Sequence, residues 1–264
     1  MRPEHSIEHG MFVREYAPSA GARESVPVIW IHGLGESGLS FESLLAGKRW
    51  RGRRHLVPDL PGYGRATWPS TPLSLCGQAD RLAAWLDGRG VDSAVLVGHS
   101  MGGVLALVLA ERHPGRITGL VDVEGNKTLD DCVYSAQAAG ADPQQFAATG
   151  FDRLRERIGD SADDDTALRG YYASLRLADP CQFLGNAAEL VELSRGGTLV
   201  SRLAAIDQPR LYIGGVPRGA GERTLAAVKR AGIPHVLVEG AGHWPFLDRP
   251  EAFAAALDEF LARL

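Results

Sequence analysis

A short apolar run that ends in a Gly-x-Ser-x-Gly motif constrains the fold of this chain more than any other feature. Residues 94–97 are apolar, the motif occupies residues 98–102, and an Ala- and Leu-rich segment follows with no helix breaker before Pro114. This order predicts a buried strand, a tight turn and a helix. Small flanking glycines would let strand and helix approach each other and would leave the Ser100 hydroxyl exposed on the turn. The first amides of the helix would then face negative charge developing near Ser100.

Strand-like apolar runs alternate with helical patterns on both sides of this motif. An edge strand is expected over residues 10–16, and further strands are expected over residues 26–31, 54–57, 94–99, 117–123, 210–214 and 234–239. Helices are expected over residues 74–86, after Ser100 and over residues 250–264. This alternation predicts an α/β fold with a mostly parallel, twisted sheet flanked by helices.

The alternation stops in one long segment. Residues 127–205 contain no strand-like apolar run, and they carry helix-start signals at Thr128, Pro143, Asp163–Asp165 and Pro180. We therefore expect an all-helical cap over residues 127–205. This cap would be inserted between a first part of the core, residues 1–126, and a second part, residues 206–264.

Composition and charge argue against several classes of function. The 264 residues are 45% hydrophobic and 23% charged, and the net charge of −4 gives no reason to expect a nucleic acid or membrane partner. The three cysteines, Cys76, Cys132 and Cys181, show neither a disulfide framework nor zinc spacing. The N-terminus lacks the apolar region of a signal peptide, and no run approaches a membrane span. We expect a cytoplasmic protein with a small-molecule substrate and no cofactor or metal; its oligomeric state, with a homodimer as one option, stays open.

A second glycine-rich loop, residues 32–38, directly follows the apolar strand that ends at Ile31. Together with the motif around Ser100, this arrangement resembles the nucleophile elbow and the His-Gly-x loop of the α/β-hydrolase family. The resemblance implies an oxyanion hole made by the backbone amides of Leu34 and Met101. It also implies a structural role for Asp59, in the Pro- and Gly-rich loop after the next strand.

A serine hydroxyl needs a neighbouring base to act as a nucleophile. His243 follows an apolar strand and lies in a Gly-rich loop, at the strand end where open α/β sheets bind their ligands. The α/β-hydrolase family has its catalytic histidine at this position, whereas a buried structural histidine is the competing interpretation. Of the other histidines, His99 would point away from its neighbour Ser100, and His32 would brace the oxyanion loop. Packing or exposed roles fit the remaining five, which are His5, His9, His55, His113 and His235.

The third member of a Ser-His-acid triad departs from the common family pattern. Most members carry an Asp in the loop after the strand that follows the cap, but here no carboxylate occurs in that loop before Glu222, and Pro217-Arg218 stand near its place. Glu124, at the end of the strand after the nucleophile, is the favoured replacement. Haloalkane dehalogenases, certain epoxide hydrolases and zearalenone-type lactonases place their acid there. Asp122 and Glu222 stay open as alternatives, and Glu124 could instead bridge the cap to the core.

A serine nucleophile favours attack on an acyl carbon, whereas dehalogenases and epoxide hydrolases use a carboxylate. We therefore expect a serine hydrolase that cleaves a carboxylic ester or lactone of a medium-sized hydrophobic substrate through an acyl-enzyme. Candidate pocket residues beside the site are Gly33, Tyr134, Phe183 and Trp244. Two alternatives stay open: hydrolysis of a carbon–carbon bond in a β-diketone-like substrate, and a non-catalytic receptor for a small molecule.

Overall fold

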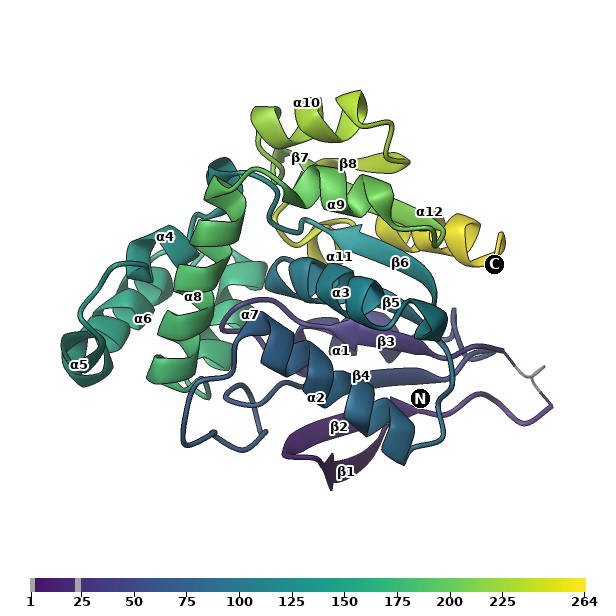
Figure 1. Cartoon of the computed structure of the whole chain (residues 1–264), viewed down its shortest axis with the longest axis horizontal. Helices are drawn as coiled ribbons and strands as arrows, with labels where there is room; N and C mark the ends of the chain where they lie inside the picture. The colour runs from purple at the N-terminus through teal and green to yellow at the C-terminus, as the bar shows by residue number, and fades with distance from the viewer. Residues whose placement is uncertain (1–2, 22–24) are drawn as a thin grey trace.

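An eight-stranded sheet forms the centre of the molecule (Figure 1). A computed structural model describes residues 3–21 and 25–264 of the chain. The strand order is β1-β2-β4-β3-β5-β6-β7-β8. The pairs β1–β2 and β2–β4 are antiparallel, and all other neighbouring pairs are parallel. The strands are β1 (Glu4–Glu8), β2 (Met11–Tyr16), β3 (Val28–Ile31), β4 (His55–Asp59), β5 (Ala94–His99), β6 (Ile117–Val123), β7 (Arg210–Arg218) and β8 (His235–Gly242). The predicted α/β architecture is confirmed.

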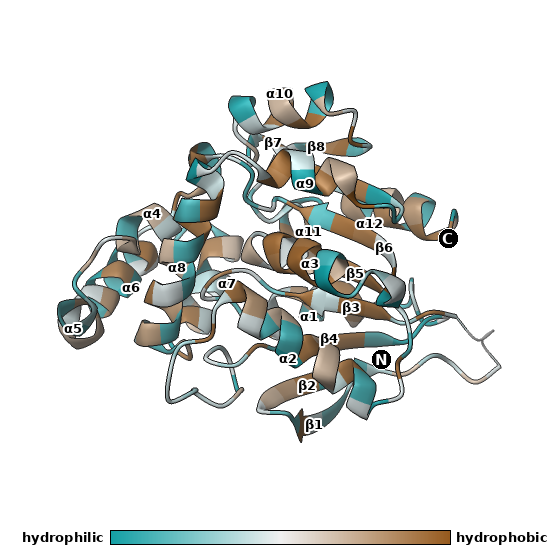
Figure 2. Cartoon of the chain, in the orientation of Figure 1, coloured by the Kyte–Doolittle hydropathy of each residue, from teal (hydrophilic) through white to brown (hydrophobic). Residues whose placement is uncertain are grey.

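Helices cover both faces of this sheet and exclude water from its central strands. Every residue of β3 and of β5 is buried, which explains why both strands are apolar runs and do not alternate (Figure 2). The helices outside the segment between β6 and β7 are α1 (Glu42–Leu45), α2 (Leu75–Gly88), α3 (Met101–Arg112), α10 (Glu222–Arg230), α11 (Pro245–Asp248) and α12 (Pro250–Leu261). Because α3 contacts both β5 and β6, its first ten residues are all buried.

The segment between β6 and β7 is helical. All of its residues are described, and none of them lies in a strand. Its main helices are α4 (Ser135–Ala138), α5 (Pro143–Gln145), α6 (Phe151–Asp160), α7 (Thr166–Leu175), α8 (Pro180–Arg195) and α9 (Leu199–Ala205). Aspartate side chains cap three of them: Asp142 accepts from the Gln145 amide of α5, Asp165 accepts from the amides at the start of α7, and Asp179 accepts from the Cys181 amide at the start of α8. In Figure 1 helices α4 to α8 lie together at the left, beyond the ends of the central strands. The exact domain boundaries stay a prediction.

Several elements differ from the sequence-based expectation, among them β2, β7 and α10. β2 is not the edge strand, because the polar strand β1 pairs with its outer side. β7 continues to Arg218, four residues beyond the predicted end, and pairs there with the end of β8. Helix α10 was not expected, since its sequence is strongly charged and only Thr224 and Val228 are buried. The polar strand β1 is held by backbone pairing, and the charged helix α10 is held by a narrow apolar stripe. Both are weak signals in a sequence.

The structure also bears on membranes, metals and cysteines within residues 3–21 and 25–264. No helix in these ranges has both the length and the apolar character needed to cross a bilayer. The same ranges contain no group of three or more His, Cys, Asp or Glu side chains placed to hold a metal ion. All three cysteines are free; Cys132 is buried, and the other two are exposed.

Candidate active site

Ser100 occupies the tight turn between β5 and α3. Its backbone has φ 53° and ψ −118°, a strained conformation for a residue with a side chain. A Cβ on Gly98 would lie 2.2 Å from the carbonyl oxygen of Gly102, and a Cβ on Gly102 would lie 2.1 Å from the carbonyl oxygen of Ile31. Only glycine fits at either position, so the predicted strand–turn–helix is present, with the close packing that its two glycines permit.

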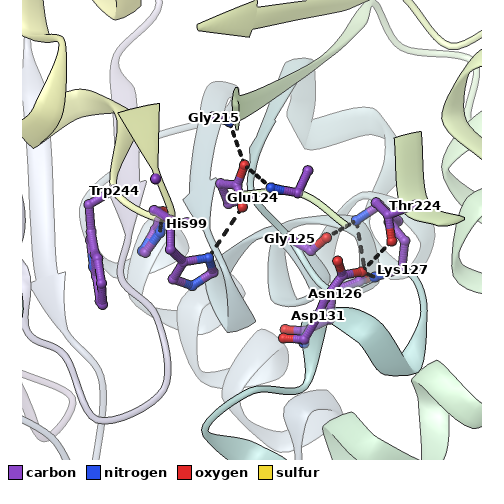
Figure 3. Close-up of polar contacts among 12 residues, drawn as sticks. His99, Glu124, Gly125, Asn126, Lys127, Asp131, Gly215, Thr224 and Trp244 are labelled. Atoms are coloured by element: carbon purple, nitrogen blue, oxygen red, sulfur yellow. Dashed lines mark hydrogen bonds and ion pairs between the residues drawn. The ribbon is translucent and has the colours of Figure 1, made fainter. Parts of the chain in front are cut away.

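Glu124 follows the last residue of β6 and points toward the loop that carries His243. Its backbone also has a positive φ, 53°, and its side chain is buried. Oε1 accepts hydrogen bonds from the amides of Gly215, at 2.5 Å, and Ala220, at 3.0 Å, while Oε2 lies 3.3 Å from Nδ1 of His243 (Figure 3). The carboxylate is therefore oriented by β7 and its following loop, although it belongs to β6.

The two alternative acids do not approach His243. Asp122 is fully buried, and its Oδ2 lies 2.6 Å from Nζ of Lys127, which is also fully buried. Its Oδ1 accepts from the Gly125 amide at 2.9 Å. Asp122 thus closes the turn that follows β6. Glu222 is exposed at the start of α10, and neither residue lines the cavity that contains Ser100.

Ser100, Glu124 and His243 share one cavity of about 230 Å³. Of the predicted pocket residues, Tyr134 and Trp244 line this cavity, and so does Leu34. The ring of Phe183 is instead fully buried among the helices, with the Phe146 and Phe151 rings at 6.2 and 5.1 Å, because that face of α8 points into the helical layer. Gly33 is not a lining residue either, but it lies close to Ser100: a Cβ there would be 3.1 Å from Cβ of Ser100.

The cavity wall was only partly foreseeable. Tyr171 joins Tyr134 and Trp244 in an aromatic cluster, with ring centroids 5.0 and 5.6 Å away. The wall also contains several residues with no motif around them: Asn126, Asp130, Asp131, Val133, Asp165, Leu168, Leu190, Arg218 and Asp248. Their approach to Ser100 depends on how the helical segment folds back over the sheet, which no local sequence signal reports.

The loop after β3 brings a free amide to the cavity that contains Ser100. Within the described residues, the Leu34 amide has no hydrogen-bond acceptor. Met101 is the first residue of α3, where a helix amide has no acceptor within its own helix. His32 stabilises this loop, since Nδ1 donates to the Gly33 carbonyl at 2.8 Å and Nε2 accepts from the Leu60 amide at 3.0 Å. Burial lowers the pKa of His32, in agreement with a neutral ring.

Asp59 lies outside the cavity and organises the neighbouring loops. Its carboxylate forms a buried ion pair with Arg14 at 2.6 Å. It also accepts from the amides of Gly38, at 2.7 Å, and Arg65, at 2.9 Å. These contacts hold the loop after β3 against the loop after β4, which agrees with the structural role expected for Asp59.

Two further buried residues, Glu36 and His99, form a carboxylate–histidine pair, of which Glu36 lines the cavity, and the sequence reasoning gave neither of them a role at the site. Glu36 is 2% exposed, and its carboxylate lies 2.9 Å from Nδ1 of His99. Burial alone would raise the pKa of Glu36, but the His99 charge and hydrogen bonds from His99 and Trp244 lower it to about 2. The available signal was a lone glutamate inside a Gly-rich loop that follows a buried strand.

Comparisons with known proteins find related sequences and similar folds. The chain is 32% identical over 255 residues to a pimeloyl-[acyl-carrier protein] methyl ester esterase of Edwardsiella ictaluri, which covers 91% of this chain and 94% of the relative. Its fold resembles that of the enol-lactonase from Burkholderia xenovorans, with a TM-score of 0.78, 18% identity and coverage of 98% and 100%. A thermophilic esterase from Thermogutta terrifontis gives a TM-score of 0.79, 21% identity and coverage of 96% and 93%.

The match to a family model extends over most of the chain. The model of the alpha/beta hydrolase family matches residues 28–256, a range that runs from the first residue of β3 into α12. It therefore contains the turn at Ser100, the helical segment and the loop of His243. The chain belongs to the alpha/beta hydrolase family.

Proposed function

We propose that this protein hydrolyses a carboxylic ester or lactone of a medium-sized hydrophobic substrate through an acyl-enzyme, with Ser100 as nucleophile, His243 as general base and Glu124 as the acid. One observation carries the proposal: Glu124 lies 3.3 Å from Nδ1 of His243, and both residues share a cavity with the strained Ser100. A carboxylate at Nδ1 fixes the tautomer that leaves Nε2 free to accept a proton.

The proposed reaction has two halves. His243 takes the hydroxyl proton of Ser100 while the oxygen attacks the carbonyl carbon of the substrate. The tetrahedral intermediate then loses the alcohol oxygen, which receives the proton from His243. In the second half, His243 takes a proton from water, the water oxygen bonds to the acyl carbon, and the bond to Ser100 breaks as the serine regains its proton.

Backbone amides would stabilise the oxyanion in both halves. The Leu34 amide has no acceptor within the described residues, and the Met101 amide begins α3. Preorganised donors of this kind contribute about 3–4 kcal/mol each to transition-state stabilisation. The proposed oxyanion hole requires the loop after β3 to stay at a fixed, short distance from Ser100. The close approach of Gly33 to Ser100 favours this, since a Cβ at Gly33 would lie 3.1 Å from Cβ of Ser100.

The size and lining of the cavity support a modest acyl or lactone group. At about 230 Å³, the cavity is below the range of about 300–1,000 Å³ that is usual for drug-sized ligands. Tyr134, Tyr171, Trp244 and Leu168 supply apolar surface around Ser100. The named activities of the relative and of the two solved structures are esterase and lactonase, which are both acyl-transfer reactions to water.

Covalent labelling combined with turnover tests the proposal. We expect purified protein to hydrolyse p-nitrophenyl esters or a lactone, and a fluorophosphonate probe to modify one residue, Ser100, as located by mass spectrometry. Ser100→Ala should abolish both labelling and turnover, while retaining the thermal transition of the wild type. Stoichiometric ligand binding with neither labelling nor hydrolysis would instead support the receptor interpretation and overturn the proposal.

A further inference from the structure

A second carboxylate–histidine pair lies behind the proposed triad and has no role in the reaction described above. His99 is fully buried and Glu36 is 2% exposed, and Nδ1 of His99 lies 2.9 Å from Oε1 of Glu36. The other ring nitrogen of His99, Nε2, lies 2.7 Å from the carbonyl oxygen of His243. The side chain of His99 thus contacts the backbone of the proposed base, although His99 is next to Ser100 in the sequence.

The partners of His99 determine its protonation state. A carbonyl oxygen can only accept, so Nε2 must carry a proton. The carboxylate of Glu36 already accepts from Nε1 of Trp244 at 2.9 Å and from the Gly33 amide at 3.2 Å, which favours its ionised form. A proton on Nδ1 as well would make His99 an imidazolium facing this carboxylate, whose Oε1 lies 2.9 Å from Nδ1. Burial alone would lower the pKa of His99, but Glu36 and the His243 carbonyl raise it above its ordinary value.

This pair connects the three loops that would perform the reaction. Glu36 belongs to the loop with the free Leu34 amide, and His99 directly precedes the nucleophile. Trp244 follows the proposed base, and Figure 3 shows it beside His99, with ring centroids 6.0 Å apart. A buried charge pair is costly unless its geometry is well satisfied, and one documented use of such pairs is to specify a single arrangement.

We propose that His99 is a positioning residue for the general base: as an imidazolium held by Glu36, it fixes the backbone carbonyl of His243 and couples that loop to the loop of the oxyanion hole. The inference rests on the proposed function. In this arrangement His243 is held twice, by Glu124 at Nδ1 of its ring and by His99 at its backbone. His99 itself touches neither the cavity nor the substrate, because it is not a lining residue.

A consequence for pH dependence follows from the surroundings of His99. The ionisable groups that face it are Glu36 from the loop after β3, His243 after β8 and Glu124 after β6, and His32 in turn faces Glu36. Loss of the His99 proton at alkaline pH would remove one of its two contacts. We therefore expect an alkaline decrease in kcat that depends on His99 and is absent when its ring is replaced.

Steady-state kinetics of His99→Gln tests the positioning role. The amide can replace only one of the two contacts, so kcat should fall roughly 10- to 100-fold while KM changes by less than about threefold. Glu36→Gln should give a similar loss, and the double variant should be no worse than either single one, because both changes break the same link. A His99→Gln protein with wild-type kcat would overturn the inference.

A matched control separates positioning from general stability. His55 is also buried and joined to two partners, Nε1 of Trp30 at 3.1 Å and the carbonyl of Trp50 at 3.1 Å, but it lies at the start of β4, outside the cavity. His55→Gln should lower the thermal transition and leave kcat unchanged. Equal losses of kcat in the His55 and His99 variants would contradict a specific role for His99.

NMR of the wild-type protein keeps the inference testable even if His99→Gln does not fold. Imidazole ¹⁵N–¹H correlations at about pH 6.5, the ordinary pKa of a histidine, should show protons on both ring nitrogens of His99, and a neutral ring there would overturn the inference. This measurement does not require turnover. Absence of ester or lactone hydrolysis in the wild type would therefore count against the proposed function alone, and a neutral His99 in an active enzyme would count against the inference alone.

Discussion

Nδ1 of His243 lies 3.3 Å from Oε2 of Glu124, a residue 119 positions earlier in the chain. The Glu124 carboxylate therefore reaches the histidine from the end of β6, whereas β7 and the loop after it contribute backbone amides that orient it. A Cβ at Gly219 in that loop would lie 2.6 Å from Oε1 of Glu124. The end of β7, where the family resemblance places an Asp, is shaped here to receive a carboxylate from the neighbouring strand.

Replacing a carboxylate by its amide tests whether Glu124 or Asp122 is the acid partner of His243. Glu124→Gln should lower kcat by roughly 10³–10⁴-fold, because an amide no longer stabilises the charged histidine or fixes its tautomer. The midpoint of thermal unfolding should move little, since the amide keeps the shape of the side chain. Kinetics with a p-nitrophenyl ester would measure the loss.

The matched variant for this prediction is Asp122→Asn. It leaves the fully buried Lys127 without its carboxylate partner, so the free energy of unfolding should fall by about 3–5 kcal/mol. Folded Asp122→Asn protein should keep kcat within about tenfold of the wild type, because Asp122 does not contact His243. The reverse pattern, with Asp122→Asn inactive and Glu124→Gln active, would assign the acid to Asp122.

The turn at Ser100 should tolerate no side chain at its flanking glycines. Gly98→Ala would place a Cβ 2.2 Å from the carbonyl oxygen of Gly102, so we expect a loss of more than about 4 kcal/mol in unfolding free energy or no folded protein. Gly170→Ala is the control, since Gly170 is exposed within α7 and a Cβ there would have no neighbour within 4 Å. That change should stabilise the protein by about 0.5–1 kcal/mol in urea unfolding.

Acid should weaken the fold through Glu36. Its pKa is lowered from 4.5 to about 2 in the folded protein, so its ionised form stabilises the fold above about pH 4.5. That contribution is lost as the pH falls from about 4.5 toward 2. Urea unfolding at a series of acidic pH values should show a weaker pH dependence in Glu36→Gln than in the wild type, by up to about 1 kcal/mol per pH unit. Parallel curves for the two proteins would show that folding does not lower the pKa of Glu36.

The small cavity should limit the length of the acyl group. A volume of about 230 Å³ accommodates a short chain, so p-nitrophenyl butyrate should have a kcat/KM at least about tenfold above that of the dodecanoate. Tyr134→Ala would enlarge the cavity wall and should reduce this preference. An unchanged profile in Tyr134→Ala would show that the acyl group occupies another part of the cavity.

The local sequence determined the elements whose signals are short-range. The apolar runs of β3 and β5, the glycines around Ser100 and the acidic caps of α7 and α8 each depend on neighbours in the chain. Steric exclusion, strand burial and helix capping act over a few residues, so these features could be predicted. The position of His243 after an apolar strand belongs to the same class.

Only the tertiary structure decided which distant groups meet. The sequence favoured Glu124 but left Asp122 and Glu222 open, and the register of β6 against β7 brings one of the three to His243. The link from Glu36 through His99 to the His243 carbonyl and the burial of Phe183 away from the cavity likewise depend on loop and helix packing. Such contacts join residues far apart in the chain, and their geometry follows from how whole layers pack, which no local pattern records.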